Sequence, residues 1–105
     1  MMKIVVNAKY GGFGLSDAAM RRIGEFKGLT QSHQIGFTER SLSRDDPVLV
    51  AVVEDLREAA DGENAELVVV EIPDGVDWEI EECEGVEWVS EKHRSWYPVR
   101  RRRLP

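Results

Sequence analysis

The stretch from Glu66 to Glu91 constrains the fold more than any other part of the chain. It contains three short segments, "ELVVVEI", "VDWEIEE" and "VEWVSE", joined by the tripeptides "PDG" and "CEG". Both tripeptides end in glycine, which tolerates the positive φ at the end of a type I turn with a bulge. The pattern predicts three strands that form an antiparallel meander.

A first strand and a first helix are predicted ahead of this meander. Residues 3–9, "KIVVNAK", form a short β-branched segment that glycines terminate. Ser16 is a good N-cap for a helix over residues 17–27, and Leu15 and Met20 are spaced to pack across that cap. The apolar face of this helix is expected to contain Ala19, Ile23 and Phe26.

A second helix is predicted to begin at Asp46 and to stop at Gly62. Asp46 is the expected N-cap, and Pro47 occupies the first helical position, where its missing N–H costs nothing. The buried stripe of this helix is expected to contain Leu49, Val53, Leu56 and Ala60. Between the two helices, the polar residues 28–44 show no regular period, which predicts a long loop.

The order β-α-α-β-β-β predicts one α+β domain with a small, mostly antiparallel sheet. Two helices are expected to pack on the sheet, so that both helical stripes and one sheet face meet in a single core. A chain of 105 residues fits one domain, over residues 1–96, followed by a basic tail over residues 97–105. The longest apolar run, residues 48–53, is far too short to cross a bilayer, and no leader opens the chain. We therefore expect a soluble, unexported protein.

The formal net charge of −6 conceals an uneven distribution along the chain. Residues 1–91 contain all 20 acidic residues and eight basic ones, a charge of −12, whereas the last 14 residues carry +6. Arg94, Trp96 and the run 100–103 combine cations with an aromatic ring, a combination that suits nucleic acid. Alternatively, this tail lies on the protein's own acidic surface. We expect weak nucleic-acid binding at most.

The glycine-rich turn before the first helix is a candidate site for a small anionic ligand such as a nucleotide. A strand, a glycine turn and a helix N-terminus can present backbone N–H groups to an anion. The candidate ligand-binding residues are Tyr10, Gly11, Gly12, Phe13, Gly14 and Ser16. The motif lacks the third glycine of the dinucleotide fingerprint, places Asp17 in the first helical turn and lacks the Gly-Lys-Ser/Thr of a P-loop. The alternative is a packed turn that Tyr10 and Phe13 anchor.

A row of carboxylates follows one face of the second segment of the meander. Asp77, Glu79 and Glu81 alternate with Val76, Trp78 and Ile80, which share the opposite face. Carboxylates on alternate strand residues lie about 6.6–6.8 Å apart, a spacing similar to that of phosphates along a nucleic-acid strand. The row, extended by Glu87 and Glu91, would then imitate nucleic acid before a basic host protein. The alternative is the solvated face of an antiparallel sheet.

Several separated motifs of this chain resemble one known family. They are the opening strand followed by "YGGFGLS", then "ELVVVEIPDGVDWEIEE", "GVEWV" and "EKHRSW". Together they resemble a family of small, mostly uncharacterised proteins encoded by bacteriophages and prophages, over residues 3–96. The resemblance implies a viral protein made in the cytoplasm of the host bacterium, and it implies no particular activity or site residue.

The inventory of catalytic groups is thin. His33 lies in the long loop, His93 lies near the tail, and no Ser, Cys or Asp stands at a recognised nucleophile spacing. The single cysteine, Cys83, cannot form an internal disulfide, which fits a reducing cytosol. We expect neither a metal nor a cofactor.

These observations favour a non-enzymatic binding protein. It would act in the infected bacterium by inhibiting a host or defence protein, or by sequestering a small, nucleotide-like ligand. One alternative is a small enzyme or nucleotide-processing domain that uses the glycine-rich turn. The other alternative is a structural component that forms a homo-oligomer through Trp78, Trp88 or Trp96.

Overall fold

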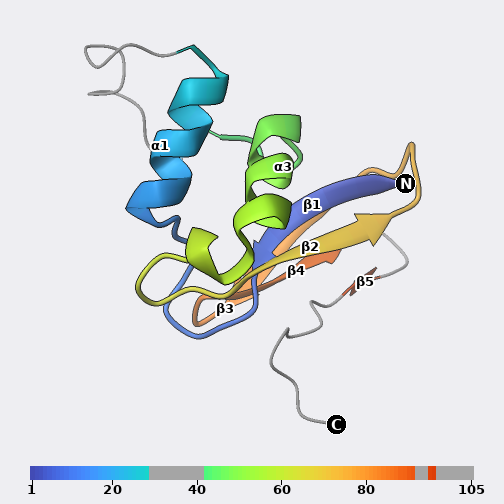
Figure 1. Cartoon of the computed structure of the whole chain (residues 1–105). Helices are drawn as coiled ribbons and strands as arrows, with labels where there is room; N and C mark the ends of the chain where they lie inside the picture. Colours follow the sequence, from blue (N-terminus) through green and yellow to red (C-terminus); the bar gives the residue numbers. More distant parts are fainter. Residues whose placement is uncertain (29–41, 92–94, 97–105) are drawn as a thin grey trace, which may run out of the picture.

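The structure, a computed structural model, describes residues 1–28, 42–91 and 95–96 (Figure 1). Its elements are β1 (Met2–Asn7), α1 (Asp17–Phe26), α3 (Pro47–Leu56), the 3-10 turn η2 (Arg57–Ala60), β2 (Leu67–Ile72), β3 (Glu79–Cys83), β4 (Val86–Ser90) and β5 (Ser95–Trp96). The predicted α+β class is confirmed, and so is the predicted order of the main elements. The short strand β5 and the turn η2 are additions.

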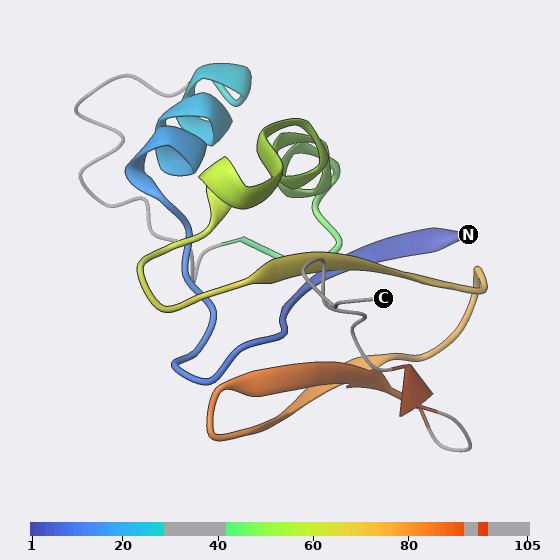
Figure 2. The ribbon, with the colours of Figure 1, turned by 60° about the horizontal axis from the view of Figure 1, so that its bottom comes forward.

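The molecule has three layers, which Figure 2 shows from the side. The two helices form one outer layer, and the antiparallel pair β1–β2 forms the middle layer. The antiparallel sheet β3-β4-β5 forms the third layer. The middle pair therefore has one face toward the helices and the other toward the second sheet.

The strand β1 is buried on both faces. Val5 belongs to the core on the helical side, together with Ala19, Ile23, Leu49, Val53 and Leu67. Ile4 and Val6 belong to a separate core between the two sheets, together with Val70, Ile72 and Val89. Successive side chains of a strand point to opposite faces, so the continuous run "IVV" serves both cores. The expectation of a single core is therefore wrong, because the β1–β2 pair separates two.

The strand pairing differs from the predicted meander in one respect. Residues 67–72 pair with β1, with Val5 opposite Val69, and not with β3. The connection from β2 to β3 spans residues 73–78 and carries the chain from the middle layer to the third. Hairpin loops usually have two to five residues, and the loop between β3 and β4 has two, Glu84 and Gly85. Both have positive φ, 52° and 92°, so this turn is shorter than the predicted three-residue turn with a bulge. The third strand of the second sheet is β5.

The helix α1 begins at its predicted cap. Ser16 Oγ accepts a hydrogen bond from the Ala19 N–H at 3.1 Å and donates one to the Ala59 carbonyl at 2.6 Å. Leu15 is buried and Met20 packs against the same core. Phe26, expected on the buried face, is 62% exposed, because it lies in the last turn, beyond the packed part of the helix.

The helix α3 also begins as predicted. Asp46 Oδ1 accepts hydrogen bonds from the N–H groups of Val48 and Leu49 at 2.8 and 3.3 Å. Lys27 Nζ donates to Asp46 Oδ2 at 2.8 Å. Partial burial acts to raise the pKa of Asp46, but the hydrogen bonds from Lys27 and from the two N–H groups outweigh it and hold that pKa below its usual value.

The α-helical part of this second helix is shorter than predicted. It stops at Leu56 because Arg57 adopts φ 53° and ψ −122°, a conformation outside the helical region. The chain continues as the 3-10 turn η2 to the buried Ala60. Of the predicted stripe, Leu49, Val53 and Ala60 are buried and Leu56 packs against the same core.

Candidate functional site

The glycine-rich turn lies where three parts of the backbone meet. Gly11 and Gly12 have φ values of 122° and 103°, a range that residues with a side chain rarely adopt. The turn of the β3–β4 hairpin packs directly against them: a Cβ on Gly85 would overlap Gly12 N and would lie 2.8 Å from Gly11 N. The segment after η2 packs from another side, and the Gly62 N–H donates to the Gly14 carbonyl at 2.9 Å. These glycines therefore permit close contacts between backbones.

The other predicted ligand-binding residues of this turn have diverse surroundings. The Tyr10 side chain is 68% exposed, so it does not anchor the turn. Phe13 lies beneath the guanidinium of Arg44, whose Cζ is 3.7 Å from the ring centroid. The hydroxyl of Ser16 is occupied by the cap of α1. The geometry agrees with a packed turn, and binding of a small anion there stays a prediction.

A buried asparagine joins the turn to the rest of the molecule. Asn7, at the end of β1, has no exposed surface. Its side-chain Nδ2 donates to the carbonyls of Lys9 and Gly85 at 2.6 and 2.7 Å, and its Oδ1 accepts from the Glu66 N–H at 2.9 Å. One side chain thereby connects the end of β1, the start of β2 and the hairpin turn.

A buried ion pair lies beside this asparagine. Arg44, just before α3, donates from both terminal nitrogens to the carboxylate of Glu87 on β4, at 2.6 and 2.9 Å. Only 7% of Glu87 is exposed, and its Oε1 also accepts from the Asn7 N–H at 2.8 Å. The two parallel N–H···O bonds are the strong bidentate arrangement of arginine and carboxylate.

The ion pair closes the outer edge of β1. The Ala8 N–H donates to the Glu66 carbonyl, so in this register the N–H groups of Val5 and Asn7 point away from β2. The Val5 N–H donates to the Arg44 carbonyl at 2.9 Å, and the Val5 carbonyl accepts from the Arg44 guanidinium at 3.3 Å. The Asn7 N–H donates to Glu87. Arg44 and Glu87 thus replace a neighbouring strand.

Sequence reasoning did not find this network, and it placed Glu87 wrongly. Glu87 was expected to extend the exposed acidic row, but it points inward beside Val89 and is buried. The register explains the difference: Glu87 faces Glu82, and the next pair, Glu81 and Trp88, lies on the opposite face. No local signal in the chain identifies Arg44 as the partner, because 43 positions separate the two residues.

The predicted acidic row itself is exposed. Asp77, Glu79 and Glu81 are exposed to solvent, and Val76, Trp78 and Ile80 pack against the core between the sheets, as predicted. We call Asp77, Glu79 and Glu81 the acidic hairpin face. With Trp78, Ser90 and Glu91 they line an open concavity of about 510 Å³.

Carboxylates of this face are uncompensated in the part of the chain that the structure describes. The side chains of Asp77, Glu79 and Glu81 make no ion pair or hydrogen bond there. Other carboxylates have basic partners: Glu54 pairs with Lys3 and Asp55 with Arg22. Among the described residues, the acidic hairpin face is therefore a local excess of negative charge.

Several residues of the predicted sites lie outside the described residues, namely Arg94, His33, His93 and the tail over residues 97–105. Trp96 belongs to β5 and stands opposite Val89 in the register.

Within residues 1–28 and 42–91, no group of three or more histidine, cysteine or acidic residues could hold a metal ion, and Cys83 is an exposed free thiol. Over the same residues, neither helix has the length and apolar character that crossing a membrane requires.

Known proteins offer no guide to this site. Comparisons with protein-family models, with curated proteins and with solved structures give no match. The resemblance to phage and prophage proteins therefore stays a prediction.

Proposed function

We propose that this chain is a non-enzymatic binding protein that uses the acidic hairpin face to bind a basic surface of another protein. In keeping with its resemblance to phage and prophage proteins, the partner would be a host or defence protein of the infected bacterium. Binding would block the surface by which that partner holds nucleic acid.

The observation that carries this proposal is the uncompensated charge of Asp77, Glu79 and Glu81. Three exposed carboxylates without a described basic partner favour association with a positively charged surface, and this attraction weakens as salt is added. Glu79 and Glu81 are alternate residues of β3 and therefore lie about 6.6–6.8 Å apart, whereas Asp77 precedes the strand.

The support behind the face strengthens the proposal. Gly85 packs against the glycine-rich turn, its carbonyl accepts from Asn7, and Glu87 is held by Arg44. The hairpin is therefore fixed to the middle layer at its turn and along β4. A preorganised face loses less conformational entropy when it binds a partner.

A charge reversal on the face tests the proposal. Immobilised wild-type protein and the variant Glu79→Lys/Glu81→Lys are incubated with bacterial lysate at low and at raised salt, and retained proteins are identified by mass spectrometry. The matched control is Glu25→Lys/Glu63→Lys, which makes the same charge change at exposed positions on α1 and in the loop before β2. Circular dichroism checks that all three proteins are folded.

We expect a basic protein that the wild type and the control retain at low salt and that the hairpin variant loses. Retention of the same proteins by all three would contradict the proposal. The nucleotide alternative has its own assay: a rise in melting temperature with nucleotides or phosphate that Gly12→Val abolishes. A Cβ at Gly12 meets no neighbouring atom, but a φ of 103° strains any side chain there, so circular dichroism must show that the Gly12→Val variant is folded.

A further inference from the structure

The two sheets have exposed edges that are protected in different ways. The outer edge of β1 is closed by Arg44 and Glu87, as described above. The outer edge of β3 carries the carboxylates of Glu79, Glu81 and Glu82, and charged side chains discourage pairing with another strand. The outer edge of β2 has one charged residue, Glu71, and its sequence, "LVVVEI", is otherwise apolar.

The open groups of β2 belong to two residues. Because Val6 and Val68, like Ala8 and Glu66, form hydrogen-bonded pairs, the N–H and carbonyl groups of Val69 and Glu71 point away from β1. These backbone N–H and carbonyl groups have no hydrogen-bond partner among the described residues. Residues on either side of this open stretch have no free N–H for another strand. The Leu67 N–H donates to Asp61 Oδ1 at 2.9 Å, and Pro73 has no N–H.

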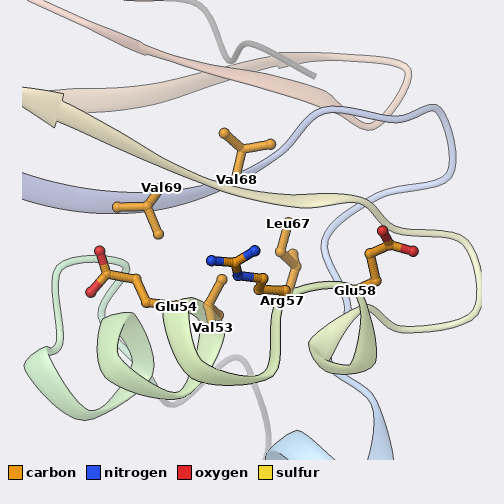
Figure 3. A pocket seen from close by; sticks show the side chains of 7 residues that line it. All are labelled: Val53, Glu54, Arg57, Glu58, Leu67, Val68 and Val69. Carbon is orange, nitrogen blue, oxygen red and sulfur yellow. The ribbon is translucent and has the colours of Figure 1, made fainter. Parts of the chain in front are cut away.

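A groove runs along this edge, between β2 and the helical layer (Figure 3). Its volume is about 560 Å³, and its walls include Leu67 and Val69 of β2 and Val53 of α3. The guanidinium of Arg57 extends into the groove toward β2. Glu54 and Glu58 also line the groove, and Glu54 is paired with Lys3. Arg57 makes no ion pair with another described residue.

We propose that a second copy of this chain occupies the edge, with the two β2 strands paired antiparallel about a twofold axis at Val70. In this register Val69 faces Glu71 of the partner subunit, and Glu71 faces Val69 of the partner subunit. The pairing forms four hydrogen bonds and uses every open group of these two residues. It requires nothing from Leu67, whose N–H is already bound, or from Pro73.

The side chains fit this register. On the face toward the second sheet, Val70 meets Val70 of the partner subunit, and Val68 meets Ile72 of the partner subunit. These are apolar pairs of the kind that stabilise antiparallel strands. A shift by one position to the register centred on Glu71 would place two glutamates opposite each other, which is destabilising.

The helical layer has the right position for the same arrangement. The axis is perpendicular to the sheet, so it places the two α3 helices on one face of the four-stranded sheet β1-β2-β2-β1. Since α3 contacts both β1 and β2 and lines the groove at the edge of β2, the two copies of α3 lie on the same side of the sheet, beside the paired strands.

Within the groove, the unpaired Arg57 is complementary to a carboxylate of the partner subunit. Glu71 shares the helix-facing side of β2 with Val69, so Glu71 of the partner subunit enters the groove beside Val69, where the Arg57 guanidinium lies. Each dimer thus contains two symmetric ion pairs between Arg57 and Glu71 of the partner subunit. Within one copy, Glu71 stands opposite Lys3 in the register, so the carboxylate is also near its own lysine.

A charge-swap series tests the pairing. Sedimentation equilibrium over a range of concentrations measures the dimer dissociation constant of the wild type, of Arg57→Glu, of Glu71→Arg and of the variant that carries both changes. All changed positions are exposed, and circular dichroism checks folding. We expect each single change to raise the dissociation constant at least tenfold and the double change to restore most of the affinity. The control Glu63→Arg should leave it unchanged.

Cysteine crosslinking tests the register. In a Cys83→Ser background, Val70→Cys places two thiols opposite each other across the axis, within the Cα separation of about 4.4–6.8 Å that a disulfide needs. We expect mild oxidation to crosslink Val70→Cys and to leave Lys9→Cys, an exposed position off the edge, uncrosslinked. A protein that stays monomeric at every concentration overturns the proposal, as does a dimer that the charge swaps do not affect. Binding of an extended peptide to the monomer alone would likewise overturn it.

Discussion

Replacement of Arg44 by methionine should destabilise the protein more than any change of a surface ion pair. The variant keeps a side chain of similar length but leaves the carboxylate of Glu87, 7% exposed, with the Asn7 N–H as its remaining described donor. Loss of one partner of a buried ion pair costs about 3–5 kcal/mol. Because the Arg44 side chain is itself 22% exposed, we expect the lower end, about 3 kcal/mol. For a domain of this size, that loss lowers Tm by about 12 °C.

The assay is urea denaturation of four proteins in a double-mutant cycle: the wild type, Arg44→Met, Glu87→Gln and the double variant. The double variant has no unpaired buried charge, and its glutamine can still accept from the Asn7 N–H, so we expect a loss of about 1–2 kcal/mol. Arg22→Met is the matched control, since its partner Asp55 is 63% exposed and such pairs contribute less than about 1 kcal/mol. Additive losses in the cycle, or a loss for Arg44→Met no larger than for Arg22→Met, would refute the reasoning.

Two further changes test the caps and turns. Asp46→Asn keeps the N-cap acceptor but removes the charge. Because the pKa of Asp46 is lowered on folding, the stabilisation by its charge is present above the unfolded pKa of about 4 and is lost as pH falls. We therefore expect the Tm values of the variant and the wild type to differ at pH 7 and to converge in acid. Gly85→Ala and Gly75→Ala both place alanine at positive φ, at 92° and 77°, but a Cβ at Gly75 meets open space and one at Gly85 overlaps the glycine-rich turn. Urea denaturation should show that the free energy of unfolding falls by about 1–2 kcal/mol for Gly75→Ala and by clearly more for Gly85→Ala. Equal losses would show that the glycine-rich turn moves to accommodate the added Cβ.

The sequence predicted the local features of the fold well. The caps at Ser16 and Asp46, the proline at the first position of α3 and the hairpin at Gly85 all depend on interactions within a few residues. Cap and turn residues belong to a few residue types with known local preferences, so a short stretch of sequence is enough to predict them. The alternation along β3 likewise predicted which side is buried.

The long-range features escaped prediction for a physical reason. The partner of a strand and the partner of a buried charge depend on the arrangement of layers, which no short pattern encodes. The "LVVVEI" segment pairs equally well with a preceding or a following strand by composition, and the doubly buried β1 became its partner. Glu87 illustrates the same point, since its burial depends on Arg44, 43 positions away.

The pairing of β1 with β2 has a consequence for the growing chain. Asn7 faces Leu67 in the register, so the strand partner of β1 begins 60 positions after β1 ends, although Arg44, which also binds β1, is made earlier. At about 5–20 residues per second, this length of chain takes about 3–12 s to make, during which Ile4 and Val6 lack the core between the two sheets, whereas the helical residues that cover Val5 are made earlier. The hydrogen bond from Asn7 to Glu87 spans 80 positions and forms later still. Nascent chains that pause before Leu67 should therefore be bound by chaperones or aggregate.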